Sequence, residues 1–242
     1  MIKTLRSTAA IMSILYALAI AAPLAQAQPW TSFDDNTRYL ALGDSLTASY
    51  GAKPVTQGFV YQLYQGGVID NINNLLLCGL GVPNATTVEV GLYQVPQAGL
   101  CFAATGTNYR KVVTLTVGGN DLIAIAFGQT TLPQYANRLG LILTALVTQF
   151  PDAKIYVANL YDPRLPIPGL SLLVDAMNQA IAGVVALVPP GHVFLVDLHA
   201  AFDGRSGLLL SEKHGAEVNQ VHPTDAGYKV IAKAFEDVIR AN

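Results

Sequence analysis

Apolar runs of strand length alternate with amphipathic stretches of helix length along most of the chain. The predicted strands are Arg38–Leu42, Asn74–Cys78, Val112–Val117, Lys154–Leu160 and His192–Leu198. The predicted helices are Leu132–Phe150, Leu170–Val188 and Thr224–Arg240, the last with Thr224 as its N-cap. Strands that alternate with helices pair in parallel and are covered on both faces. The pattern predicts one α/β domain with three layers, α/β/α, around a central parallel sheet of about five strands.

The stretch Gly79–Arg110 follows neither the helical nor the strand period. Glycines, prolines and threonines are frequent in it, and these residues favour turns and loops. We therefore expect loops there, with a short helix at most.

The amino terminus has the pattern of a secretory signal peptide. Two basic residues, Lys3 and Arg6, precede the apolar run Ala9–Ala22, and the sequence then reaches an A-x-A pattern ending at Ala27. The alternative is a membrane anchor, but the run is shorter than the ~20 residues that a spanning helix needs. We expect cleavage after Ala27, a domain at 28–242 without a stable membrane anchor, and a secreted or periplasmic protein.

Composition limits the classes of function. Of the 242 residues, 52% are hydrophobic and 12% charged, with a formal net charge of −2, so the chain does not resemble a disordered or nucleic-acid-binding protein. Its two cysteines, Cys78 and Cys101, are too few for a zinc site of paired CxxC motifs. In an oxidising compartment they predict a disulfide; two free thiols are the alternative.

Three polar segments follow predicted strands or precede the last helix, where ligands of an open parallel sheet bind. Ser45 follows the first strand, Asn120 follows Gly118-Gly119, and His222 stands before Pro223. A serine beside a neutral histidine can act as a nucleophile, and an asparagine amide can donate to an oxyanion. Taken singly, each residue has an alternative: a helix cap for Ser45 and a turn residue for Asn120. His199, which follows the fifth predicted strand, is a competing base.

Together, these segments resemble the blocks of the SGNH, or GDSL-type, hydrolase family. The matches are Gly43–Leu46, Gly118–Asp121 and His222-Pro223, in that order along the chain. The resemblance implies a flavodoxin-like fold with strand order 2-1-3-4-5 and serine-dependent ester hydrolysis. It also implies Ser45 as nucleophile, His222 as base, and an oxyanion hole. The hole would consist of the Ser45 N–H, an N–H of a second block near residue 84, and the Asn120 amide.

Two positions depart from the family pattern. Asn84 stands where the pattern has glycine, but it keeps the backbone N–H, and asparagine tolerates a positive φ better than most residues; Gly81 is the alternative in another register. Asn219 stands in the acid position, where the pattern has aspartate. Asn219 or a backbone carbonyl would then orient His222, or Glu217 would supply the acid.

The apolar segment Leu122–Phe127 follows Asn120, where an acyl group would lie. The aromatic residues after Ser45 either pack in the core or line a hydrophobic cleft: Tyr50, Phe59, Tyr61 and Tyr64. We therefore expect a serine esterase acting on acyl or lipid esters. A carbohydrate acetylesterase and a catalytically weakened binding protein are the alternatives. The sequence has no metal-binding or nucleotide-binding motif, so we expect no cofactor, an ester as the ligand, and a monomer.

Overall fold

The structure is a computed structural model that describes residues 37–65, 78–103, 110–210, 212–214 and 217–242. The predicted signal peptide, 1–27, and most of the predicted strand Asn74–Cys78 lie outside these residues.

Four parallel strands form the central sheet in the order β1-β2-β3-β4. Their bounds are Thr37–Gly43 for β1, Arg110–Thr116 for β2, Ala153–Ala158 for β3 and Val193–Val196 for β4. Gly79 makes an isolated parallel bridge to Ala41 of β1, the strand at the edge of the sheet. Gly79 directly follows the predicted strand Asn74–Cys78, and its bridge lies on the side of β1 where the order 2-1-3-4-5 would place that strand.

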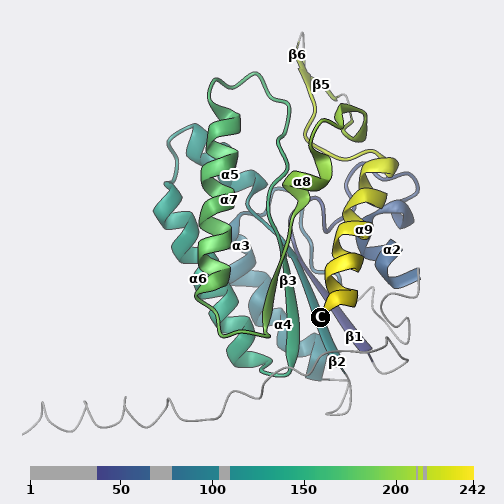
Figure 1. Cartoon of the computed structure of the whole chain (residues 1–242), viewed down its shortest axis with the longest axis vertical. Helices are drawn as coiled ribbons and strands as arrows, with labels where there is room; N and C mark the ends of the chain where they lie inside the picture. Colours follow the sequence, from purple (N-terminus) through teal and green to yellow (C-terminus); the bar gives the residue numbers. More distant parts are fainter. Residues whose placement is uncertain (1–36, 66–77, 104–109, 211, 215–216) are drawn as a thin grey trace, which may run out of the picture.

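Helices cover both faces of the sheet, which confirms the predicted three layers (Figure 1). Successive side chains of a strand point to opposite faces. On β1, Leu40 and Leu42 pack in one core with α4 (Val95–Ala103), α6 (Leu132–Gln149) and α7 (Leu170–Ala186). Tyr39 and Ala41 pack in the other core with α2 (Phe59–Gln65) and α9 (Asp225–Ala241).

The long helices begin where the sequence predicts. Thr131 and Gln134 form a capping box at the start of α6. The Thr224 side chain accepts a hydrogen bond from the Gly227 N–H at the start of α9, as its assignment as N-cap requires. The predicted helices at residues 132–150, 170–188 and 224–240 are thus confirmed within two residues at each end.

The prediction of loops over Gly79–Arg110 is wrong for much of that stretch. It contains α3 (Thr87–Glu89), the π-helical segment η3 (Val90–Gln94) and α4, which run into one another. A capping box between Thr86 and Glu89 starts this helical region. A π-helical turn takes more residues than an α-helical turn, so it shifts the buried face and obscures the 3.6-residue period in the sequence.

Shorter elements surround the carboxyl ends of the strands. They are η1 (Val55–Gln57), α5 (Gly119–Ala126), α8 (Leu198–Phe202), η4 (Ser206–Leu208) and an antiparallel hairpin of β5 (Glu212–His214) and β6 (Glu217–Asn219). The hairpin lies beyond the end of the sheet, close to α8 (Figure 1). The hairpin was not predicted from the sequence, because three-residue strands leave too short a pattern of alternating apolar and polar residues.

The predicted disulfide is not present. Cys78 and Cys101 are half-buried thiols that do not form a disulfide. Their side chains are hydrogen-bonded to each other, and this contact together with burial raises the pKa of the Cys78 thiol. The two residues therefore meet, as the prediction requires, but as thiols in non-covalent contact.

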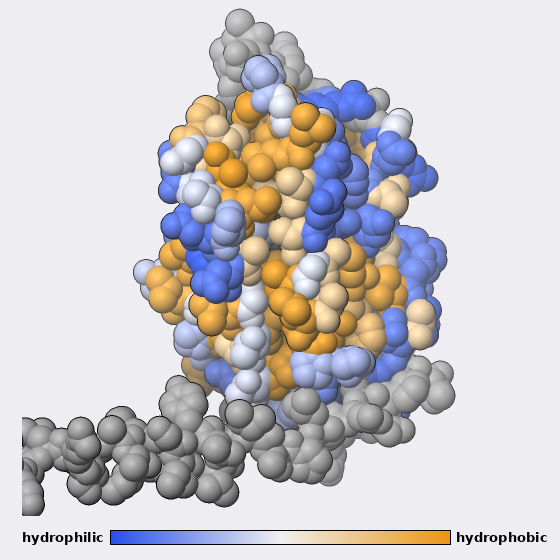
Figure 2. Space-filling model, turned by 60° about the vertical axis from the view of Figure 1, so that its left-hand side comes forward, coloured by the Kyte–Doolittle hydropathy of each residue, from blue (hydrophilic) through white to orange (hydrophobic). Residues whose placement is uncertain are grey.

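Hydrophobic side chains are frequent on the face formed by α6 and α7 (Figure 2). Exposed apolar residues there include Leu141 on α6, Leu172 on α7 and Leu187 just after α7. None of the helices in the described part of the chain is both long and apolar enough to span a bilayer.

Candidate functional site

Ser45 lies in a tight turn directly after β1. Gly43 has φ of +143°, and a Cβ built on it would lie 2.1 Å from the Thr116 carbonyl oxygen, so the chain can bend here only at glycine. The Asp44 N–H donates to the same carbonyl at 3.0 Å. After Ser45 the chain closes one turn, in which the Tyr50 N–H donates to the Ser45 carbonyl at 2.9 Å. This turn does not continue directly into an α-helix, so Ser45 is not the cap of a helix, which was the alternative role given to it.

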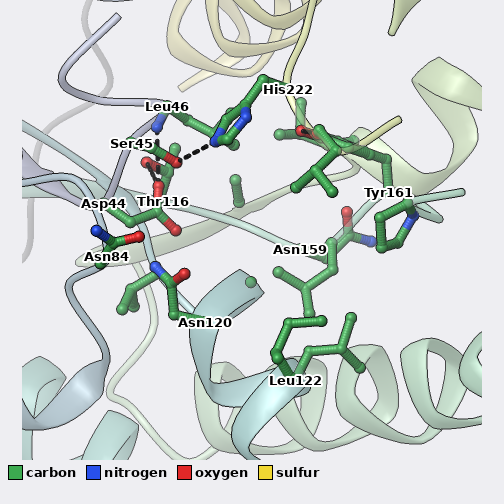
Figure 3. A pocket seen from close by; sticks show the side chains of 18 of the residues that line it. Asp44, Ser45, Leu46, Asn84, Thr116, Asn120, Leu122, Asn159, Tyr161 and His222 are labelled. Atoms are coloured by element: carbon green, nitrogen blue, oxygen red, sulfur yellow. Dashed lines mark hydrogen bonds between the residues drawn. The ribbon is translucent and has the colours of Figure 1, made fainter. Parts of the chain in front are cut away.

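His222 lies beside Ser45, although 177 positions separate them in the chain (Figure 3). The distance from its Nε2 to the Ser45 Oγ is 3.1 Å, which is within hydrogen-bonding range. The Tyr50 ring contacts the imidazole on another side, with 4.4 Å between ring centroids. His199, the competing base, lies in α8 and lines a different, polar pocket with Asp162 and Arg205.

Asn120 and Asn84 line the same cleft as Ser45 and His222 (Figure 3). The Asn120 side-chain Nδ2 donates to the Ala85 carbonyl at 2.9 Å, which leaves the second N–H of the amide for another acceptor. Asn84 has φ of +66°, the left-handed conformation that asparagine was expected to tolerate. Gly81, the alternative to Asn84, packs so closely on Thr47 that a Cβ would lie 2.5 Å from it.

A buried carboxylate joins the Asn120 segment to the loop that carries Asn84. Asp121 accepts hydrogen bonds from the Thr87 N–H at 2.9 Å and the Thr87 hydroxyl at 2.6 Å. Arg138 approaches the same carboxylate at 3.3 Å from α6. Asp121 ends the block Gly118–Asp121, but its role could not be predicted from the sequence, because it depends on contacts with distant residues.

Gln94 supports the turn that carries Ser45 through two hydrogen bonds to Gly43. Its side-chain oxygen accepts from the Gly43 N–H, and its side-chain nitrogen donates to the Gly43 carbonyl, both at 2.8 Å. The side chain is buried, at the end of the π-helical segment η3. Gln94 thereby replaces a neighbouring strand at the last residue of β1. Gln94 was not among the predicted site residues, because nothing in the sequence distinguishes it from Gln97 three residues later.

Asp44, next to Ser45, is a buried carboxyl group that lines the cleft. Burial raises its pKa from 3.8 to about 7, against the opposing effect of the hydrogen bond donated by the Leu46 N–H at 3.0 Å. The Thr116 hydroxyl makes a longer contact, 3.5 Å, to the same carboxyl oxygen. The pKa of this carboxyl group therefore lies close to neutral pH.

A cleft opens beside Ser45 and is lined mostly by apolar side chains. These are Leu46, Val117, Leu122, Ile123, Ala158, Leu160, Tyr161, Pro163, Leu165, Leu198 and Val221. Leu122 thus lies where the sequence analysis expected an acyl-binding residue. Phe59, one of the aromatic residues considered for the cleft, does not line it. Its side chain is buried and stacks on Phe235 with 5.1 Å between ring centroids, so its role is core packing.

The residue that orients His222 from the acid position stays a prediction. Asn219 and Glu217 belong to β6, on the segment that leads to His222, but their side chains lie outside what the structure describes. Within the described residues, no group of three or more His, Cys, Asp or Glu side chains is placed to hold a metal ion.

Known proteins carry the same combination of sequence blocks and fold. A model of the GDSL-like Lipase/Acylhydrolase family matches residues 41–230. The chain belongs to this family. The spore germination lipase LipC of Bacillus licheniformis is 23% identical over 209 residues, which are 81% of this chain and 93% of that lipase. Family membership makes the chain a carboxylic ester hydrolase.

Two solved structures establish the fold. A member of the lipolytic G-D-S-L family from Veillonella parvula aligns with a TM-score of 0.61 at 18% identity, over 84% of this chain and 97% of its own. The family 3 carbohydrate esterase of Clostridium thermocellum aligns with a TM-score of 0.58 at 21% identity, over 85% of this chain and 98% of its own. The flavodoxin-like fold that the resemblance implied is thereby confirmed.

Proposed function

We propose that this hydrolase is exported from the cytosol and cleaves esters of medium or long acyl chains, with Ser45 as nucleophile and His222 as general base. The observation that carries the proposal is the 3.1 Å contact between Ser45 Oγ and His222 Nε2 at one end of an apolar cleft. A nucleophile within hydrogen-bonding distance of its base is the arrangement that serine-dependent acyl transfer requires.

In the proposed reaction, the Ser45 hydroxyl gives its proton to His222 as the oxygen attacks the ester carbonyl. The negative charge that develops on the carbonyl oxygen is stabilised by the Ser45 N–H, the Asn84 N–H and the free N–H of the Asn120 amide. The intermediate collapses when His222 returns the proton to the leaving alcohol, which leaves an acyl group on Ser45. Water then attacks this acyl-enzyme with the same base, releasing the acid and restoring the serine.

Asn219 is proposed to orient the imidazole through its side-chain oxygen, with Glu217 as the alternative. If Asn219 occupies the acid position, Asn219→Asp adds a charge that stabilises the imidazolium. The acid limb of kcat/KM then shifts to higher pH and kcat rises. If Glu217 is the acid, Glu217→Gln inactivates the enzyme while Asn219→Asp changes neither quantity. The pH profiles of the two variants distinguish these assignments.

The cleft supports acyl esters over acetylated sugars. An acetyl group needs only a small pocket, whereas most of the side chains that line this cleft are apolar, among them Leu122, Leu160 and Leu165. Burying one CH₂ group contributes roughly 0.8 kcal/mol, so each added methylene should strengthen binding until the cleft is filled. The lipase from Bacillus licheniformis is consistent with this substrate class, whereas the carbohydrate esterase from Clostridium thermocellum represents the competing class.

The test is hydrolysis of p-nitrophenyl esters from acetate to dodecanoate by the purified enzyme and by Ser45→Ala. We expect kcat/KM to rise with chain length in the wild type and hydrolysis to be abolished in Ser45→Ala, which should melt at an unchanged temperature. Ser49→Ala is the matched control, because the Ser49 hydroxyl in the same turn is buried without a hydrogen-bond partner. Activity on acetate alone would favour sugar deacetylation. Failure of a fluorophosphonate probe to label Ser45 would favour a binding protein.

Export is the separate part of the proposal, and it depends on the predicted signal peptide. N-terminal sequencing of the mature protein from the periplasm or the medium tests it directly. A mature chain that begins at Gln28 supports export with cleavage after Ala27. A chain that stays in the cytosol with residues 1–27 attached would contradict it.

A further inference from the structure

Tyr161 contacts both the acyl cleft and the segment that carries His222. It stands just after β3, is buried, and lines the cleft (Figure 3). Its hydroxyl donates a hydrogen bond to the Val221 carbonyl at 2.6 Å. Val221 directly precedes His222, so this bond fixes the peptide unit from which the histidine side chain begins.

The ring of Tyr161 is itself held in place, which gives its hydroxyl a defined position. It stacks on Phe202 of α8, with 4.5 Å between ring centroids and 18° between ring planes. A side chain packed in this way has lost most of its rotamer freedom before the hydroxyl bonds to Val221. The position of the Val221 carbonyl is therefore set by packing against the core as well as by the local backbone.

A second contact joins the same two stretches of chain. The Arg164 N–H donates to the Gln220 carbonyl at 2.9 Å, and the Gln220 N–H donates to the Arg164 carbonyl at 3.1 Å. Residues 161–164 and 220–221 thus run side by side, and the wall of the cleft and the approach to His222 form one unit. Loss of the Tyr161 hydroxyl would loosen this unit without separating it.

We propose that Tyr161 is a positioning residue: its hydroxyl aligns the His222 imidazole with Ser45, while its ring forms part of the acyl-binding wall. The proposal rests on the proposed function, in which His222 is the base. It assigns separate tasks to two parts of one side chain. The hydroxyl should affect the chemical step, and the ring should affect the binding of long acyl chains.

Tyr161→Phe removes the hydroxyl and keeps the ring. A small misplacement of a catalytic group is costly in rate, and the Arg164–Gln220 pairing limits the displacement, so we expect kcat to fall roughly ten-fold. KM for octanoate and dodecanoate esters should change less than two-fold, because the wall is intact. The rate at which a fluorophosphonate labels Ser45 should fall with kcat, since labelling also depends on the base.

Tyr156→Phe is the matched control. Tyr156 lies on β3, and its buried hydroxyl has no hydrogen-bond partner, so its loss should leave kcat and KM unchanged. Tyr161→Leu is the second variant, which removes the hydroxyl and the ring together. It should lower kcat as Tyr161→Phe does and also raise KM for long esters more than for acetate.

The outcomes separate this inference from the function on which it rests. If the wild type hydrolyses esters, Ser45→Ala is inactive, and Tyr161→Phe keeps kcat and the labelling rate within two-fold, the proposed function stands and the positioning role is overturned. A fall in melting temperature with unchanged kcat would also overturn it, since it would show a structural role alone. If the wild type does not hydrolyse esters, the proposed function fails and this inference fails with it.

Discussion

The two halves of the site are held in different ways. The half that carries Ser45, Asn84 and Asn120 lies at the ends of β1 and β2, where buried side chains fix the backbone from several directions. Gln94 and Asp121 make two or more hydrogen bonds each there. The half that carries His222 lies between the β5–β6 hairpin and α9. Backbone hydrogen bonds join this segment to its neighbours, such as the bond from the Leu210 N–H to the His222 carbonyl at 2.7 Å. One side-chain hydrogen bond, from the Tyr161 hydroxyl to the Val221 carbonyl, supports it from the core side.

This difference fits the separate roles proposed for the oxyanion hole and for the base. An oxyanion hole stabilises charge best when its donors are already in place, so the half that forms it benefits from rigid, buried support. The base exchanges protons with two partners during the reaction, and a few contacts suffice to orient it. Because unpaired buried polar groups are costly, substitutions in the first half should reduce stability as well as activity. Substitutions around His222 should act mainly on kcat.

Asn120→Ala should show the largest effect, because it removes a donor of the proposed hole. Loss of one such donor typically lowers kcat by ~10²–10³, and KM should change little. The variant also frees the Ala85 carbonyl from its hydrogen bond, so some stability should be lost. Steady-state kinetics and thermal unfolding measure the two effects. An effect confined to KM would instead make Asn120 a substrate-binding residue.

Asp44→Asn should change how stability depends on pH. The Asp44 pKa is about 7 in the folded protein, against 3.8 as the ordinary value. Between these values the folded state keeps the proton and the unfolded state releases it, so rising pH favours unfolding. Each unit of pKa difference corresponds to roughly 1.4 kcal/mol, and the loss should be complete just above pH 7.

The asparagine side chain of that variant carries no titrating proton, so this slope should disappear. Urea unfolding of both proteins at pH 5 and pH 8 provides the measurement. The wild type should lose stability relative to Asp44→Asn over that interval. Equal slopes for the two proteins would show that Asp44 does not keep its proton in the folded state.

Gln94→Leu should have a smaller effect, and it tests whether the nucleophile turn needs its side-chain support. The substitution leaves the buried Gly43 N–H without its acceptor, which costs about 1–3 kcal/mol of stability. The Gly43 carbonyl still receives the Val82 N–H at 3.1 Å, so the loss is partial. Chemical unfolding measures the stability, and the kcat of the folded variant should also fall. Unchanged stability and kcat would remove the contrast between the two halves.

The sequence predicted those features that depend on local pattern. The long helices and the positions of Ser45, Asn84, Asn120 and His222 at one end of the sheet could be read from periodicity and from the ordered blocks. The π-helical segment could not, because it disrupts the period by which helices are recognised. The side-chain oxygen of Gln94 could not be assigned to Gly43 either, since the two residues lie 51 positions apart and meet only in the folded chain.

Contacts between distant residues account for most of what was missed. Tyr161 was not among the residues singled out from the sequence, and its bond to Val221 spans 60 positions. The predicted disulfide shows the opposite case, in which the pairing of Cys78 with Cys101 was inferred from the compartment and the even number of cysteines. The structure brings the two together but keeps them as thiols, because proximity alone does not determine the oxidation state.

Asn84→Gly should have the smallest effect of these substitutions, and it tests which part of Asn84 the oxyanion hole uses. What Asn84 supplies to the proposed hole is its backbone N–H, which glycine keeps. At φ of +66° glycine is free of the steric cost that an L-residue bears. Glycine also gains more entropy in the unfolded chain, roughly 0.4–1 kcal/mol, and the two effects oppose each other. Asn84→Gly should therefore keep kcat within two-fold and melt within a few degrees of the wild type.

Asn84→Val is the informative counterpart. A β-branched residue is poorly tolerated at positive φ, so valine should displace this peptide unit and its N–H. Activity should then fall by more than stability alone explains, in the manner of Asn120→Ala but to a lesser degree. If valine is tolerated as well as glycine in both kcat and melting temperature, the N–H of residue 84 does not contribute to the hole. The Gly81 region of the loop would then be the place to look for the missing donor.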